Sequence, residues 1–242
     1  MKGKLFTLGI GLVLMVMSLG CGLIPGTRTI TGSGDVVTRE EPITGFDRVE
    51  AGYAFHVDIS QGESFSVVVR VDDNLVEYLE TTVVGNVLEI GIRDGVSIQA
   101  TNLDIAVYCS NLQGITMNGV GNLSVHQSGE IEEFDLVYSG VGNAYVQLTT
   151  ERLNSTFTGV GNISVAGTAR YHDVTMSAVG NLAASSLATD TTSITMTGEG
   201  ATYVRVEDHL KVLLAGIGNV TYVGHPSIDA TITGIGSIID GN

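Results

Sequence analysis

A four-residue motif, Gly-Val-Gly-Asn or a close variant, recurs seven times in the second half of this 242-residue chain. The copies begin at Gly119, Gly140, Gly159, Ala178, Gly198, Gly216 and Gly234, at intervals of 18 to 21 residues. A unit of this length cannot bury its own apolar face, so consecutive copies must stack on one another. The repeat therefore predicts a solenoid.

The residues before each motif alternate as they do in a β-strand. The position two residues before the motif is apolar or aromatic in every copy: Met117, Tyr138, Phe157, Met176, Met196, Leu214 and Ile232. The position three before it is threonine in five of the seven copies: Thr116, Thr156, Thr175, Thr195 and Thr231. This alternation indicates a strand with one buried face and an outward row of threonines. Because it restarts after the motif, we expect about two short strands per repeat, joined at a glycine-rich corner.

Copies that stack in phase align like residues into ladders. The predicted fold is therefore all-β, a parallel solenoid with rungs of 18 to 21 residues and Gly-Val-Gly-Asn corners. We expect an aliphatic ladder in the core, made of Val120, Val141, Val160, Val179, Ile217 and Ile235. We also expect a hydrogen-bonded amide ladder of Asn122, Asn143, Asn162, Asn181 and Asn219. Glu199 would place a carboxylate on the aliphatic ladder, so that rung is expected to be distorted or turned outward. The alternative is a sandwich of antiparallel hairpins, which would not require the same residue at the same phase of every unit.

The first half of the chain lacks the motif but continues the strand-like alternation, for example over residues 55–59, 65–71 and 87–90. Residues 72–79 form the one passage with helical spacing and an acidic start. No linker rich in proline or serine separates the halves, so residues 34–242 are predicted to form a single domain.

Three further segments precede the repeats: Gly-Phe-Asp-Arg-Val-Glu at 45–50, Phe-His-Val-Asp-Ile-Ser-Gln-Gly at 55–62, and Asp-Asp-Asn-Leu at 72–75. Followed by the repeats, this ordered series resembles the bacterial DUF2807 family, also named the putative autotransporter adhesin head GIN domain. The resemblance extends over residues 34–239. It implies a right-handed, β-helix-like solenoid, often on exported or lipid-anchored bacterial proteins, and the family name proposes adhesion. It supplies no established catalytic residues.

The N-terminus has the pattern of an export signal, with Lys2 and Lys4 before an apolar run that ends at Gly20-Cys21. A small residue directly before cysteine resembles the lipobox of bacterial lipoproteins, although Ser18 stands where leucine is commonest. We therefore expect a signal peptide over residues 1–20, a lipid anchor on Cys21 and a tether over residues 21–33. The protein would be exported to the cell envelope and held on a bacterial membrane. An ordinary cleaved signal and a membrane helix are the alternatives, but the run is shorter than the ~20 residues a span requires.

The composition of the chain and the spacing of its ionisable residues limit the partners and the catalytic or metal-binding groups that we expect. The chain has 11 Lys and Arg against 26 Asp and Glu, a net charge of −15, which excludes nucleic acid as a partner because phosphate binding needs a basic face. Cys109 lies in a strand-like stretch and is expected to be a buried core residue. The acidic residues between repeats share no phase and the five histidines are scattered singly. No catalytic, cofactor-binding or metal-binding residue is therefore predicted.

Two classes of function fit this sequence. The first is a non-catalytic, lipid-anchored cell-envelope protein, structural or adhesive, with a glycan or protein ligand on a face made of the threonine and amide ladders. The alternative is a carbohydrate-active β-helix enzyme, a polysaccharide lyase or hydrolase, and a groove holding two nearby carboxylates would favour it. Residues 238–242 begin to form a further rung with no evident cap, so self-association through the solenoid end is also expected.

Overall fold

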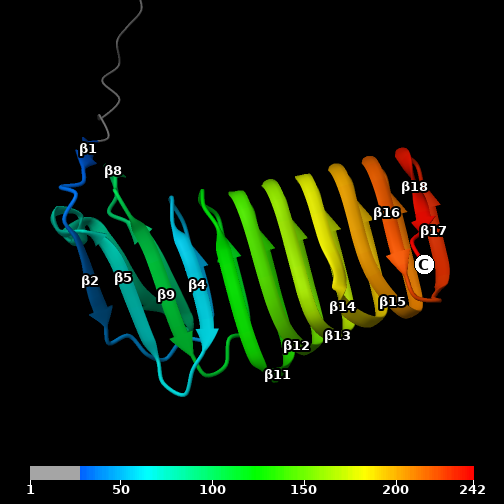
Figure 1. Ribbon diagram of the computed structural model, residues 1–242, viewed down its shortest axis with the longest axis horizontal. Helices are drawn as coiled ribbons and strands as arrows, with labels where there is room; N and C mark the ends of the chain where they lie inside the picture. The colour runs from blue at the N-terminus through cyan, green and yellow to red at the C-terminus, as the bar shows by residue number, and fades with distance from the viewer. Residues whose placement is uncertain (1–27) are drawn as a thin grey trace, which may run out of the picture.

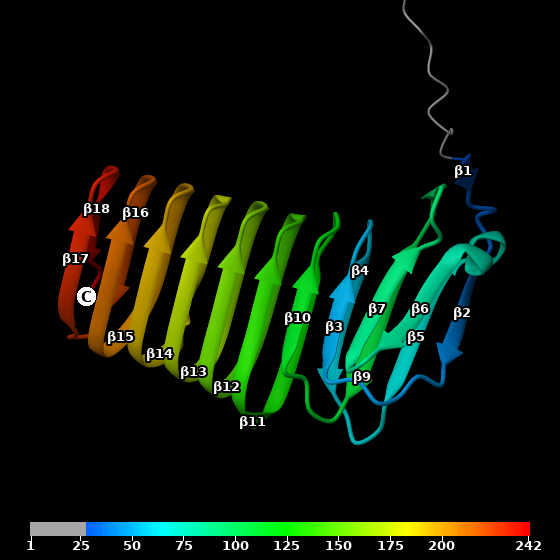
Figure 2. The ribbon, with the colours of Figure 1, turned by 180° about the vertical axis from the view of Figure 1, so that it is seen from behind.

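The computed structural model describes residues 28–242, which form a flattened β-solenoid of about 7 turns (Figure 1). The rungs follow one another in chain order, and each rung crosses two layers of strands that pack face to face (Figures 1 and 2). Neighbouring rungs pair in parallel with like residues in register, as Asn143, Asn162 and Asn181 do. The predicted fold class is confirmed.

The front layer faces the viewer in Figure 1. Its first strands are β2 (Val36–Glu41), β5 (Ser66–Asp72), β9 (Leu103–Cys109) and β4 (His56–Gln61). The back layer, seen in Figure 2, starts with β6 (Leu79–Val84), β7 (Val87–Ile92), β3 (Arg48–Ala51) and β10 (Gly114–Met117). The outermost pairs at this end are antiparallel, β2 with β5, β5 with β9, and β6 with β7. The solenoid proper is parallel from β4 and β3 onward.

The repeat segment supplies the remaining rungs. Its strands are β11 (Leu123–Tyr138), β12 (Val141–Phe157), β13 (Val160–Met176), β14 (Val179–Met196), β15 (Glu199–Leu214), β16 (Ile217–Val223), β17 (Ser227–Ile232) and β18 (Ile235–Asp240). The first part of β11 pairs with β4 and its last part with β10, so one strand serves both layers. Instead of the expected two short strands, each full repeat is therefore one long strand that bends at the edge opposite the glycines.

The expected position of the aliphatic ladder is wrong. The six residues do stack in register, but half or more of each side chain is exposed, from 50% for Val160 to 71% for Ile235. Alternation explains the error, because Phe157 points inward and Gly159, Gly161 and Ile163 fall on the same side of the chain. The valine between two inward glycines must therefore point to solvent. Glu199 occupies the same exposed position, so its rung needs no distortion.

At the glycine positions of the corner, the backbone of the preceding rung leaves no room for a side chain. A Cβ added to Gly161 would lie 1.6 Å from the carbonyl oxygen of Gly142 on the preceding rung, and its φ is +148°. Both the space and the backbone conformation therefore demand glycine. Farther from the corner the inward positions hold the core, in which Tyr138, Phe157 and Met196 are at most 1% exposed.

The Asp-Asp-Asn-Leu segment, residues 72–75, holds the N-terminal end of the solenoid through hydrogen bonds. Asp72 is fully buried, and its carboxylate accepts hydrogen bonds from the backbone N–H groups of Gly34 at 2.8 Å and Thr101 at 2.7 Å. Burial works against ionisation of Asp72, but these N–H donors outweigh it and hold the pKa of the carboxyl below its ordinary value. Asn74 accepts from the N–H of Ser33 and donates to the carbonyl of Thr31. The expected helical passage is a 3-10 helix, η1 (Asp73–Tyr78).

The expected tether, residues 21–33, is in part regular structure. Residues 28–31 form β1 (Arg28–Thr31), which pairs in parallel with β8 (Val96–Gln99). The expected signal peptide, residues 1–20, and the lipid anchor on Cys21 lie outside the described residues. Among residues 28–242 there is no helix with the length and apolar character needed to cross a membrane.

Candidate functional site

A shallow groove of about 530 Å³ crosses the front layer beside the glycine corners. Its polar lining comes from β4 and from the starts of three successive rungs and includes His56, Asn122, Ser124, Asn143, Tyr145 and Ser164. Parallel register places these residues in two outward rows, one containing Asn122 and Asn143 and the next containing Ser124 and Tyr145. This surface is termed the Tyr145 groove below.

The predicted amide ladder is present from Asn122 to Asn181 and lies along the edge of this groove. Asn219, its fifth expected member, is separated from Asn181 by the rung of Ala201 and instead accepts a hydrogen bond from the N–H of Ser237 at 3.0 Å. Asn143 Nδ2 lies 3.3 Å from Asn122 Oδ1, Asn162 Nδ2 lies 3.4 Å from Asn143 Oδ1, and Asn181 Nδ2 lies 2.9 Å from Asn162 Oδ1. At Ala201 a backbone N–H replaces the missing amide and donates to Asn181 at 2.9 Å. Each bond fixes the orientation of the side chain beside it, so the ladder presents an ordered row of amides to solvent.

Tyr145 is the prominent feature of the second row. Its side chain is 39% exposed, and the residues beside it in register are the small Ser124 and Ser164. Its hydroxyl donates to Gln147 Oε1 at 3.2 Å, and the His126 ring lies 5.5 Å away at a tilt of 46°. The tyrosine ring is therefore held in place and open to solvent on a floor of small residues.

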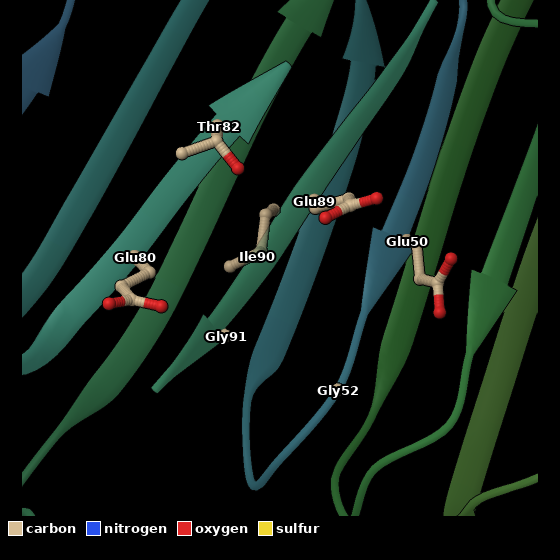
Figure 3. A pocket seen from close by; sticks show the side chains of 7 residues that line it. All are labelled: Glu50, Gly52, Glu80, Thr82, Glu89, Ile90 and Gly91. Carbon is tan, nitrogen blue, oxygen red and sulfur yellow. The ribbon is translucent and has the colours of Figure 1, made fainter. Parts of the chain in front are cut away.

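A second pocket, of about 230 Å³, is acidic. It lies on the outer side of the back layer where Glu50, Glu80 and Glu89 come from three neighbouring strands (Figure 3). Glu50 and Glu89 stand opposite each other in register, Asn118 donates to Glu50 at 3.0 Å, and Arg93 lies 3.9 Å from Glu80. This convergence was not apparent from the sequence, because strand pairing between β3 and β7 brings together residues 39 positions apart.

The three glutamates of the acidic pocket are all exposed at the surface. A glycosidase pairs one carboxyl held protonated by an apolar setting with one held ionised. None of the three glutamates is buried, and their neighbours differ, because Asn118 donates to Glu50 and Arg93 lies 3.9 Å from Glu80. Within residues 28–242 no three His, Cys, Asp or Glu side chains are grouped so as to hold a metal ion.

Two potential nucleophiles, Cys109 and Ser155, are buried in the core. Cys109 is fully buried, as expected, and burial together with the negative charge of Asp47 raises the pKa of its thiol to about 11. Ser155 Oγ lies 3.0 Å from His172 Nε2, but both side chains are at most 2% exposed. Burial lowers the pKa of His172 to about 3, and its Nδ1 has no partner among the described residues. Neither group can reach a substrate, so both are structural.

The threonine row does not share a face with the amide ladder. Thr156 and Thr175 lie on the back layer, whereas the asparagines begin the front layer on the other side of the glycine corner. Beside the threonines runs a charged row in which Arg152 pairs with Asp173 at 2.9 Å. The expected combined Thr and Asn face is therefore wrong, and the front layer alone carries the polar groove.

The fold and its surface grooves define a β-solenoid with a structural or binding role. A family model described as putative auto-transporter adhesin, head GIN domain, matches residues 45–226, and this chain belongs to that family, DUF2807. Membership in this family indicates an exported protein of the cell surface. No protein of curated function matches the sequence.

Solved structures share the fold. A putative adhesin from Bacteroides fragilis NCTC 9343 superposes with a TM-score of 0.81 at 25% identity, covering 86% of this chain and 98% of that one. A putative adhesin from Parabacteroides merdae ATCC 43184 gives 0.67 at 21% identity, covering 88% and 100% of the two chains. A putative lipid binding protein from Parabacteroides distasonis ATCC 8503 gives 0.62 at 19% identity, with coverages of 88% and 100%.

Proposed function

We propose that this protein is a non-catalytic adhesive module of the bacterial cell envelope, anchored by lipid on Cys21 and binding its ligand through the front layer. The observation that carries this proposal is the Tyr145 groove, in which an exposed aromatic ring stands beside an ordered amide ladder. Membership in a family named for adhesion supports the same role.

The anchor is tested by metabolic labelling with a fatty-acid analogue. Cys21 and Cys109 are the two cysteines of the chain, which provides a matched control. Labelling should be lost in Cys21→Ala and retained in Cys109→Ala, because Cys109 is buried. Equal labelling of wild type and Cys21→Ala would refute the anchor.

Adhesion is tested with cells that display the full chain. Displaying cells should be retained on immobilised host or bacterial surface material, and cells displaying Tyr145→Ala should be retained less. Equal retention of displaying and non-displaying cells would contradict the proposal.

The acidic pocket favours the enzyme alternative, since two glutamates stand opposite each other there. The purified protein should release no sugars from a panel of polysaccharides. Turnover that disappears in Glu50→Gln or Glu89→Gln would replace the adhesive proposal with a carbohydrate-active enzyme.

A further inference from the structure

The row that holds Tyr145 contains a second exposed tyrosine on the same face. Register aligns Tyr145 with Ser164, Ser164 with Ala183, and Ala183 with Tyr203. The two tyrosines are 39% and 44% exposed, and the two residues between them are small. At ~4.8 Å per rung, three steps separate the tyrosines by about 14 Å along the solenoid axis. The front layer thus presents two aromatic side chains with a low floor between them.

Hydrogen-bonding groups run alongside this floor. The amide ladder of Asn143, Asn162 and Asn181 occupies the adjacent outward row on the same rungs. An asparagine side chain has two N–H donors and two acceptor positions, and the ladder bonds use one donor of Asn162 and one of Asn181. Spare donors and acceptors therefore remain on the rungs of Asn143, Asn162 and Asn181, in an orientation that the ladder has already fixed, whereas the rung of Tyr203 carries Ala201 at this position.

The charges of the groove and of the whole chain limit the chemical class of ligand that can bind. Among the residues that line the Tyr145 groove none carries a carboxylate, an ammonium or a guanidinium group, and His56 is the one side chain among them that can become cationic. The whole chain has a net charge of −15, which repels anions at long range. An acidic saccharide would therefore meet a repelling field, and the cation nearest to Tyr203 along the chain, Arg205, already pairs with Glu207 at 3.3 Å.

We infer that the surface from Tyr145 to Tyr203 binds an extended neutral oligosaccharide that lies along the solenoid axis. This inference rests on the proposed adhesive function and names its ligand class. The C–H face of one sugar ring stacks on each tyrosine, because an aromatic face offers a rigid apolar surface. The hydroxyl groups of the sugars between them bond to the amide ladder. Few precisely placed polar groups beside aromatic surface are what small-ligand sites generally use.

The test is equilibrium binding to purified full chain carrying Cys21→Ala, titrated with neutral hexasaccharides of glucose, mannose or N-acetylglucosamine and with a hexamer of galacturonate. The chain has no tryptophan, so the fluorescence of its eight tyrosines can be followed during the titration without interference from tryptophan. At least one neutral hexamer should bind, and Tyr145→Ala and Tyr203→Ala should each weaken it about tenfold. Tyr108→Ala is the matched control, because Tyr108 is 41% exposed on β9 and lies outside this row.

A shorter saccharide tests the extended geometry. A neutral disaccharide cannot span both tyrosines, so Tyr203→Ala should leave the binding of a disaccharide held at Tyr145 unchanged. Preference for the galacturonate hexamer, or equal affinity of wild type, Tyr145→Ala and Tyr203→Ala, would overturn the inference. Should displaying cells adhere while no neutral saccharide binds, the ligand class is wrong and the adhesive function stands. Should neither occur, both fail.

Discussion

Ser155 Oγ and His172 Nε2 lie 3.0 Å apart inside the solenoid, where His172 is 1% exposed. Burial lowers the pKa of this imidazole from 6.5 to about 3, so the folded protein keeps it neutral over a pH range in which an unfolded chain protonates it. The stabilisation by neutral His172 is complete above pH 6.5 and is lost progressively as the pH falls towards 3.

We therefore expect the free energy of unfolding to fall with acidification more steeply in the wild type than in a variant lacking this group. The slope from His172 alone approaches ~1.4 kcal/mol per pH unit between its two pKa values. Urea denaturation at several pH values from 7.5 to 4.5 measures the slope in wild type and in the double variant Ser155→Ala with His172→Leu, which removes both polar partners. His225→Gln, at an exposed histidine, is the control. Parallel curves for wild type and the double variant would contradict the expectation.

Val160 and Gly161 are adjacent in sequence but should respond oppositely to substitution. Val160→Asp places a charge at a half-exposed position that Glu199 already occupies in another rung, so we expect a loss within about 1 kcal/mol. Gly161→Ala forces a Cβ onto the carbonyl oxygen of Gly142 at a positive φ, so we expect a loss of ~2–4 kcal/mol or failure to fold. Thermal denaturation of the two variants measures both effects. A larger loss for Val160→Asp than for Gly161→Ala would show that the valine, not the glycine, is the inward residue.

Cys109 should be chemically inert in the folded protein. With its pKa raised to about 11, only about one thiol in a thousand is ionised at pH 8, and the side chain is fully buried. In a Cys21→Ala background Cys109 is the sole thiol, and Ellman's reagent should modify it only after denaturant is added. Rapid modification without denaturant would mean that the region around β9 opens readily.

The last rung should mediate self-association, a role proposed here for the C-terminal end of the solenoid. Ile228 and Ile232 are 43% and 45% exposed, whereas their register partners Leu210 and Leu214 are fully buried. The opposite end of the solenoid presents β2 and β6, where the exposed Val36, Val37 and Val84 are interspersed with Arg39 and several glutamates. The more apolar end matches a second copy of itself better than it matches this partly charged end, so we expect a symmetric dimer rather than a filament.

Sedimentation velocity over a range of concentrations measures this association. Wild type should dimerise, and Ile228→Lys with Ile232→Lys should remain monomeric with an unchanged far-UV circular dichroism spectrum. Lys211→Glu, at an exposed site one rung inward, is the control. A wild type that stays monomeric at high concentration would contradict the proposal.

The repeat made the solenoid and its amide ladder predictable, because residues that recur in phase must align when the rungs stack. The exposure of the valines was also predictable, because counting every second residue from the inward Phe157 leads through Gly159 and Gly161 to Ile163 and leaves Val160 on the outer side. The hydrophobic character of valine had instead suggested that these side chains are buried. At this corner the backbone carbonyl of the preceding rung lies where a Cβ would be, so glycine takes the inward position and valine, a good strand former, takes the outward one.

The tyrosine row could be derived in the same way, and the acidic pocket could not. Tyr145, Ser164, Ala183 and Tyr203 each lie five residues after the first residue of a motif, so counting from the motif places them in one row, as it does the asparagines. Glu50 meets Glu89 through pairing in the irregular N-terminal part, where no repeat indicates which strands are neighbours. Register in that part is the information that a single sequence lacks.

The tight glycine corner also has a consequence for the length of the solenoid, which changes in steps of one turn. A segment such as residues 160–178 begins and ends at the same phase, so its removal would join Gly159 to Val179 and regenerate an intact Gly-Val-Gly-Asn corner. Insertion of a single residue within the corner would push a side chain against a carbonyl in the neighbouring turn, whereas rungs of 18 to 21 residues take up differences in length in bulges away from the corner. At the corner, growth or shrinkage therefore comes in whole turns, each adding about 4.8 Å. A protein built this way can set how far it projects from its attachment point by counting turns.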